Sequence, residues 1–328
     1  PDIVFLPGLR TRPPGTSFRV ELDAPLERGP VRAVEIDVET RRRVLEQVAP
    51  AWRPRLRTVF ADAGGNETEL LRAIREVTPS RRDSMAFLIA NMPPADRRIM
   101  TADALLENVE LAHDSFDASP WRVGVPESVF QEAVLPYAHI NERRDDWRAD
   151  FVSRFRAAAH AAGTQADAVR RLNRLVYETF DVTYDANKRL KNEQSPYQSI
   201  DQHCASCTGL SILLANACRA AGIPARIAGI PEWPTGDNHT WVEVYDPIDG
   251  RWHWIEALGG GAYDEGWWVG KVRGLAAEDS NEARYRIWAA SWSRPAGVPN
   301  RFPLWWLGSD EDPIPGIDRT TDYAGAGD

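Results

Sequence analysis

The sequence has few lysines, few cysteines and no long apolar run. It contains 3 cysteines in 328 residues, and its formal net charge is −9. This acidic balance argues against nucleic acid as a partner. The most apolar stretch, residues 210–230, includes Arg219 and Arg226, so we expect no membrane span, which needs about 20 apolar residues. Three cysteines exclude a disulfide framework. No closed metal-ligand set or calcium loop is visible, so we expect neither metal nor cofactor.

The amino-terminal half changes from irregular to helical. Residues 1–65 form an irregular segment, with strands predicted at 17–23 and 34–38 and a helix at 40–48. Residues 66–165 form a predicted helical region that packs on the rest of the chain. Its helices are expected at 66–77, 84–91, 101–116, after Pro126, and at 145–160. No signal segment follows Pro1, and both a cytoplasmic and an exported location stay open.

Residues 166–328 form a third predicted region, a core with a carboxy-terminal extension. One more helix is expected at 164–180, then a short strand at 182–184, a polar loop at 185–200, and a long helix at 207–221 that ends before Gly222. Strands follow at 225–230, 239–245 and 251–256, the last two joined as a hairpin, and a late helix is expected at 281–292.

Three residues in this core have the types and positions that acyl transfer by a cysteine nucleophile requires. Cys207 begins the long helix, where the helix dipole and free backbone N–H groups lower a thiol pKa and stabilise an oxyanion. His239 begins a strand after the helix, and Glu256 ends the next strand, where it can orient an imidazole ring. We therefore predict Cys207 as nucleophile, His239 as base and Glu256 as orienting carboxylate.

Residues 168–257 resemble the transglutaminase-like superfamily of cysteine enzymes. The resemblance rests on SCTGLSILL at 206–214, RAAGIPAR at 219–226 and NHTWVEV at 238–244, and residues 135–148 are similar to a flanking region of a bacterial subgroup. It implies a papain-like α+β fold, with a cysteine-bearing helix packed on an antiparallel sheet, and a Cys-His-Asp triad. The family's spacing before GIPAR selects Cys207 over Cys204. Glu256 stands where the family usually has Asp.

The resemblance implies acyl transfer from an amide bond of a protein or peptide substrate through a thioester at Cys207. Water would then make the protein a peptidase or amidase, and an amine would make it a transamidase. The alternative function is an inactive peptide- or glycan-binding module that uses the same groove, which the unusual Glu256 would favour.

Other residues compete for roles in or near the site. Cys218 is expected in the core, and Cys204 is either a spectator or a disulfide partner of Cys207. His203 lies too near Cys207 in sequence to act as its base, although it could line the cleft, and His253 should face away from the neighbouring tryptophans. Gln202 is a candidate oxyanion donor. Ten of 13 tryptophans lie between positions 233 and 306, and the candidates for a substrate groove are Trp233, Trp241 and Trp267.

Overall fold

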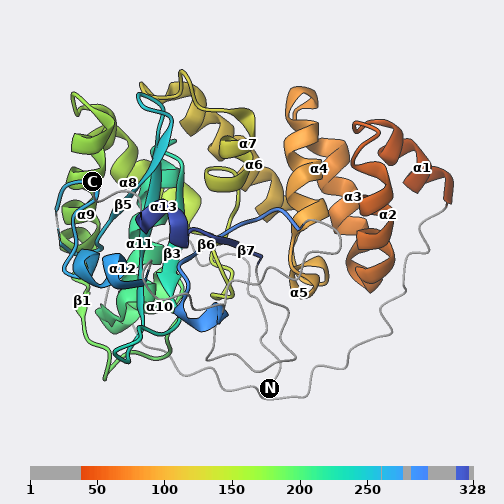
Figure 1. The fold of residues 1–328 in the computed structure, drawn as a ribbon. Coiled ribbons are helices and arrows are strands. Elements are labelled where there is room, and N and C mark those ends of the chain that lie inside the picture. Colours follow the sequence, from red (N-terminus) through yellow and green to blue (C-terminus); the bar gives the residue numbers. More distant parts are fainter. Residues whose placement is uncertain (1–37, 260, 276–281, 295–314, 325–328) are drawn as a thin grey trace, which may run out of the picture. The chain divides into compact units, whose positions relative to one another are not determined.

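The computed structural model describes residues 38–259, 261–275, 282–294 and 315–324 (Figure 1). The chain divides into two compact units, residues 1–35 and 36–328, and the first lies outside the described residues. The strand predicted at 17–23 also lies outside them. Of the strand predicted at 34–38, only Val38 is described, and it begins a helix. The predicted division at residues 65 and 165 stays a prediction.

The first part of the described chain is helical, as its hydrophobic spacing predicts. Threonine caps α6, where the Thr101 side chain accepts a hydrogen bond from the Ala104 N–H. Apolar side chains from successive helices bury one another in a shared core. The helices are α1 (Val38–Glu46), α2 (Arg53–Asp62), α3 (Glu67–Glu76), α4 (Arg82–Asn91), α5 (Pro94–Arg97), α6 (Ala102–Ala118) and α7 (Glu127–Ala133), with 3-10 turns η1 (Gly64–Asn66) and η2 (Pro79–Arg81).

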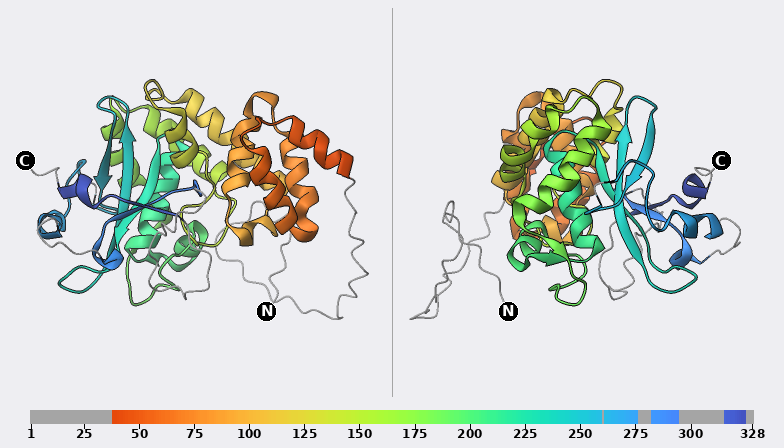
Figure 2. Two further views of the ribbon diagram at one scale, coloured as in Figure 1. Left: turned by 45° about the vertical axis from the view of Figure 1, so that its right-hand side comes forward. Right: turned by 90° about the vertical axis from the view of Figure 1, so that its left-hand side faces the viewer.

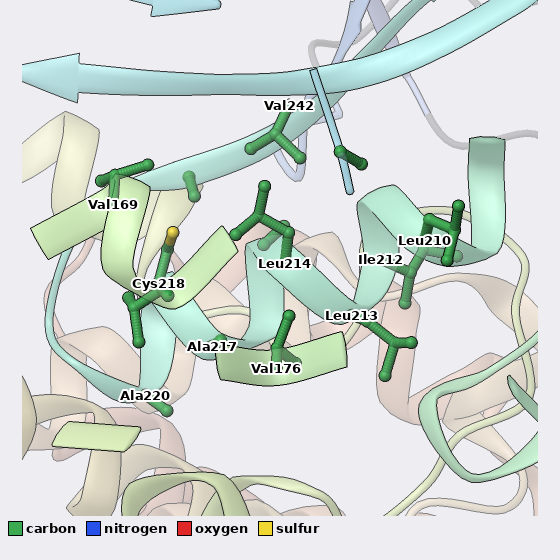
Figure 3. Packing of buried hydrophobic residues seen from close by; sticks show 14 of the residues in the cluster. Val169, Val176, Leu210, Ile212, Leu213, Leu214, Ala217, Cys218, Ala220 and Val242 are labelled. Carbon is green, nitrogen blue, oxygen red and sulfur yellow. The ribbon is translucent and has the colours of Figure 1, made fainter. Parts of the chain in front are cut away.

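A second core surrounds the cysteine-bearing helix α11 (Cys207–Ala220). Helices α8 (Arg148–His160) and α9 (Gln165–Phe180) pack against it. Figure 3 shows Val176 of α9 close to Leu213, Leu214 and Ala217 of α11. The helix α10 (Pro196–Gln202) precedes α11 and corrects the loop predicted at 185–200, because Ser195 and Gln198 form a capping box and Pro196 fits the first helical turn.

An antiparallel sheet covers α11. Its strand order is β5-β4-β3-β6-β7. Helix α11 packs on β3 and β4, and the views in Figure 2 place α12 and α13 on the opposite face of the sheet. The elements are β3 (Ala225–Ile230), β4 (His239–Asp246), β5 (Arg251–Ile255), β6 (Trp288–Ala290), β7 (Gly316–Asp318), α12 (Val269–Leu275) and α13 (Thr320–Ala324). The expected α+β fold, with its cysteine-bearing helix on an antiparallel sheet, is confirmed.

The helix predicted at 281–292 is wrong. The described part of this segment contains a 3-10 turn, η3 (Ala283–Tyr285), and strand β6. Ala289 of β6 pairs with Ala228 of β3 on one side and with Ile317 of β7 on the other. Pairing with two distant strands overrides the local helical preference of an alanine-rich segment.

Buried arginines join the helical part of the chain to α11. Arg219 of α11 donates hydrogen bonds to the carbonyl oxygens of Ala133, Pro136 and Ala138, at 2.9–3.0 Å. Burial lowers the pKa of Arg219 to about 9. The guanidinium satisfies carbonyl groups that have no secondary-structure partner, and so fixes residues 133–138 against α11.

No helix in the described ranges is long and apolar enough to span a membrane.

Candidate active site

Cys207 is the first residue of α11, directly after the N-cap Ser206. Its backbone N–H belongs to the first turn, where amide groups have no partner within the helix. Two side chains fix this end of the helix to β4: the Thr208 hydroxyl lies 3.2 Å from the Thr240 hydroxyl, and the Ser211 hydroxyl donates to the Thr240 carbonyl at 3.3 Å. The thiol is therefore held beside the start of β4.

His239 is the first residue of β4 and is 7% exposed. Its Nε2 lies 3.0 and 2.9 Å from the two carboxylate oxygens of Glu256, which follows β5. The His239 ring also lies close enough to the Cys207 thiol for each group to shift the pKa of the other. Since Nε2 faces Glu256, Nδ1 is the ring nitrogen left for the thiol. The hairpin of β4 and β5 places Glu256 beside His239, and the packing of α11 on β4 places Cys207 near the same ring.

Two residues that the sequence analysis missed hold Glu256 in place. The Asn173 side chain of α9 donates to the Glu256 carbonyl at 2.8 Å and accepts from the Leu258 N–H at 3.0 Å. The Trp268 indole N–H donates to Glu256 Oε2 at 2.7 Å. Neither residue belongs to a recognisable motif. Their only sequence signals are an asparagine on the buried face of a helix and a tryptophan in a tryptophan-rich region.

The pKa values of the thiol and the imidazole are shifted toward an ion pair. Burial alone would raise the pKa of Cys207, but hydrogen bonds from His239, the Thr240 N–H and Thr208, with the charge of His239, bring it below its usual value. Burial alone would lower the pKa of His239, but Cys207 and Glu256 together raise it to about 9. Between the lowered pKa of Cys207 and a pH of about 9, the arrangement favours a thiolate beside an imidazolium.

Comparison with known proteins agrees with this geometry. Residues 153–257 match the transglutaminase-like superfamily. The match covers about a third of the chain. It contains Cys207, His239 and Glu256 and supports a cysteine-type enzyme.

The search of curated proteins finds no match to the chain. Among solved structures, one similar chain is a candidate cysteine protease from Cytophaga hutchinsonii, with 20% identity and a TM-score of 0.28. That match covers 36% of this chain and 40% of the other, and a likeness this low supports no conclusion about fold or function.

The other two cysteines of the transglutaminase-like region have different surroundings. Cys218 lies inside the core beside α9 (Figure 3), and burial raises its pKa to about 12. Cys204 is buried in the short strand β2 (Cys204–Ala205), which pairs with β1 (Thr183–Tyr184). Both thiols are free. The core position expected for Cys218 is confirmed.

The competing histidines of this region have partners of their own. The ring of His203, a residue with a left-handed backbone after α10, lies 3.2 Å from the Asp181 carbonyl. His253 lies between Asp264, at 2.6 Å, and Asp249, at 2.9 Å. Its ring stacks on Tyr263, which packs against the α11 core, whereas Trp254 belongs to the cluster on the other face. The predicted direction of His253 is confirmed.

Of the candidate oxyanion donor and the three candidate groove tryptophans, one tryptophan is both exposed and close to His239. Gln202 is exposed at the end of α10, and no hydrogen bond within the described residues joins it to Cys207. Trp233 and Trp241 are 0% exposed, so the expectation that they line a groove is wrong, because a fully buried ring presents no surface to a substrate. Trp267 is 62% exposed, and its ring centroid lies 5.0 Å from that of His239. Trp267 therefore remains the groove candidate.

Proposed function

We propose that the protein is a cysteine enzyme that transfers acyl groups from amide bonds of a protein or peptide through a thioester at Cys207. The observation that carries the proposal is the His239 imidazole, placed between the Cys207 thiol and the Glu256 carboxylate with a pKa raised to about 9. A thiolate that forms below its usual pKa is the nucleophile required for this chemistry.

The proposed reaction uses these groups in turn. The Cys207 thiolate attacks the amide carbonyl, and the backbone N–H groups of the first turn of α11 stabilise the oxyanion that forms. The His239 imidazolium gives its proton to the leaving amine as the C–N bond breaks, and the thioester remains. Neutral His239 then removes a proton from water or from an amine, whose attack releases Cys207. Glu256 keeps Nε2–H pointed away from the thiol throughout.

A peptide-library experiment tests the proposal and separates its two outcomes. The protein is incubated with the library, with and without a primary amine, and the products are read by mass spectrometry. Hydrolysis gives cleavage or deamidation, whereas transamidation gives amine-modified peptides. Cys207→Ala is the control and should give none of these products. If wild type and Cys207→Ala gave equal amounts of product, the result would contradict a thioester at Cys207.

The alternative of an inactive binding module loses its main support. It rested on Glu256 as a non-standard residue, and the Glu256 carboxylate contacts His239 with both oxygens. The longer side chain therefore reaches the imidazole, which favours catalysis.

A further inference from the structure

Glu256 is held on a second side by Trp268, which lies outside the matched region 153–257. The Trp268 indole N–H donates to Glu256 Oε2 at 2.7 Å, and the same oxygen lies 2.9 Å from His239 Nε2. Two N–H groups from different elements therefore converge on one carboxylate oxygen. An indole N–H is only a hydrogen-bond donor, and an ionised carboxylate is only an acceptor, so the two groups are complementary.

The Trp268 ring is itself fixed. It is 0% exposed and stacks on Trp241, with ring centroids 4.1 Å apart and an angle of 23° between the planes. The Trp241 indole N–H donates to the Tyr323 hydroxyl at 2.7 Å, and that hydroxyl donates to Glu243 at 2.9 Å. Glu243 is paired with Arg226 at 2.6 Å. Trp268 is thus part of a packed and hydrogen-bonded cluster and cannot follow Glu256 if that side chain rotates.

A glutamate at this position needs such a support. It has one more rotatable bond than an aspartate, so holding its carboxylate against an imidazole costs more conformational entropy. Part of the Glu256 side chain is exposed, at 22%, and burial alone does not fix its rotamer. We propose that Trp268 is a positioning residue that holds the Glu256 carboxylate on His239 Nε2 and thereby maintains the Cys207–His239 pair. This inference rests on the proposed function.

The test measures the thiolate directly and needs no substrate. The rate of Cys207 alkylation by iodoacetamide is followed against pH in wild type and in Trp268→Phe, which keeps an aromatic ring and removes the N–H. Without that tether Glu256 leaves His239, the His239 pKa falls and the Cys207 pKa rises. We expect the midpoint of alkylation to move upward by about 0.5–1 pH unit, which is a roughly 3- to 10-fold slower rate below the midpoint.

Trp233→Phe is the matched control. Trp233 is also 0% exposed and lies in the same cluster, with its ring 6.4 Å from Trp268, and its indole N–H has no partner within the described residues. Trp233→Phe removes the same indole atoms as Trp268→Phe but no hydrogen bond to Glu256. The pH midpoint of Cys207 alkylation in Trp233→Phe should therefore match that of wild type. If Trp268→Phe does not fold, β-(3-benzothienyl)alanine at position 268 keeps the shape of the indole and replaces its N–H by sulfur.

The outcomes separate the two proposals. A wild-type midpoint near that of an ordinary thiol, at a pH of about 8.5, would contradict the proposed function itself. A low wild-type midpoint that is unchanged by loss of the Trp268 N–H would overturn the positioning role alone. Equal shifts in the Trp268 and Trp233 variants would also overturn it, because a general loosening of the cluster would then explain the result.

Discussion

Replacing Glu256 by glutamine should slow acyl transfer without unfolding the protein. Two N–H donors, from His239 and Trp268, point at the carboxylate. Glutamine has one carbonyl oxygen, so its NH₂ group would face one of these donors. The negative charge beside the imidazolium is lost as well, and Glu256→Gln therefore weakens the ion pair with Cys207.

The size of the effect follows from the pKa of His239. Its rise from 6.5 to about 9 corresponds to roughly 3 kcal/mol of preference for the imidazolium, which Cys207 and Glu256 maintain against burial. If Glu256 supplies about half, its loss costs about 1.5–2 kcal/mol, and we expect turnover to fall roughly 10- to 30-fold. Glu256→Asp restores the charge, although its carboxylate reaches less far, and should be faster than Glu256→Gln.

The pH profile of kcat/KM is the decisive assay for Glu256→Gln. In wild type the alkaline limb should follow the loss of the His239 proton at a pH of about 9. Because Glu256 raises the pKa of His239, its removal should move this limb to lower pH, and the acid limb should move to higher pH as the Cys207 pKa rises. A thermal melt checks the fold. Wild-type turnover with an unchanged profile would refute a role for Glu256 in the mechanism.

The other predictions concern the nucleophile, metal and packing. Cys207→Ala should abolish turnover, whereas Cys204→Ser should keep most of it; the reverse pattern would refute the assignment. Activity should survive exhaustive EDTA treatment, and restoration by added calcium would contradict this. Gly222→Ala should lower the free energy of unfolding by more than about 1 kcal/mol, since its φ is +73° and a Cβ would lie 2.3 Å from the Ser115 carbonyl oxygen. Gly163→Ala, with open space around it, should leave a urea melt nearly unchanged.

Local signals in the sequence determined most of the helices and the central strands. Thr164 caps α9 and Gly222 ends the turn after α11, and both residues mark these boundaries in the sequence as well. The strand at 225–230 has the predicted bounds, and the hairpin of β4 and β5 follows from its turn residues. These features depend on neighbours within a few positions of the chain, which a sequence displays directly.

The order of elements also singled out Cys207, His239 and Glu256. A cysteine at a helix start, a histidine at a strand start and a carboxylate at the end of the hairpin partner can meet only if the sheet packs on that helix. The sequence predicts this packing through apolar spacing and through the family resemblance. The distances that join His239 to Glu256 come from the structure.

Only the tertiary structure decided which tryptophans are accessible and what supports the site. Trp267 and Trp268 are neighbours in the sequence, yet one is 62% exposed above His239 and the other is 0% exposed and donates to Glu256. Strand β6 likewise forms where distant strands supply its hydrogen-bond partners, although its local sequence favours a helix. In both cases the stabilising free energy comes from contacts between residues far apart in the chain. The pattern of neighbouring residues does not predict such contacts.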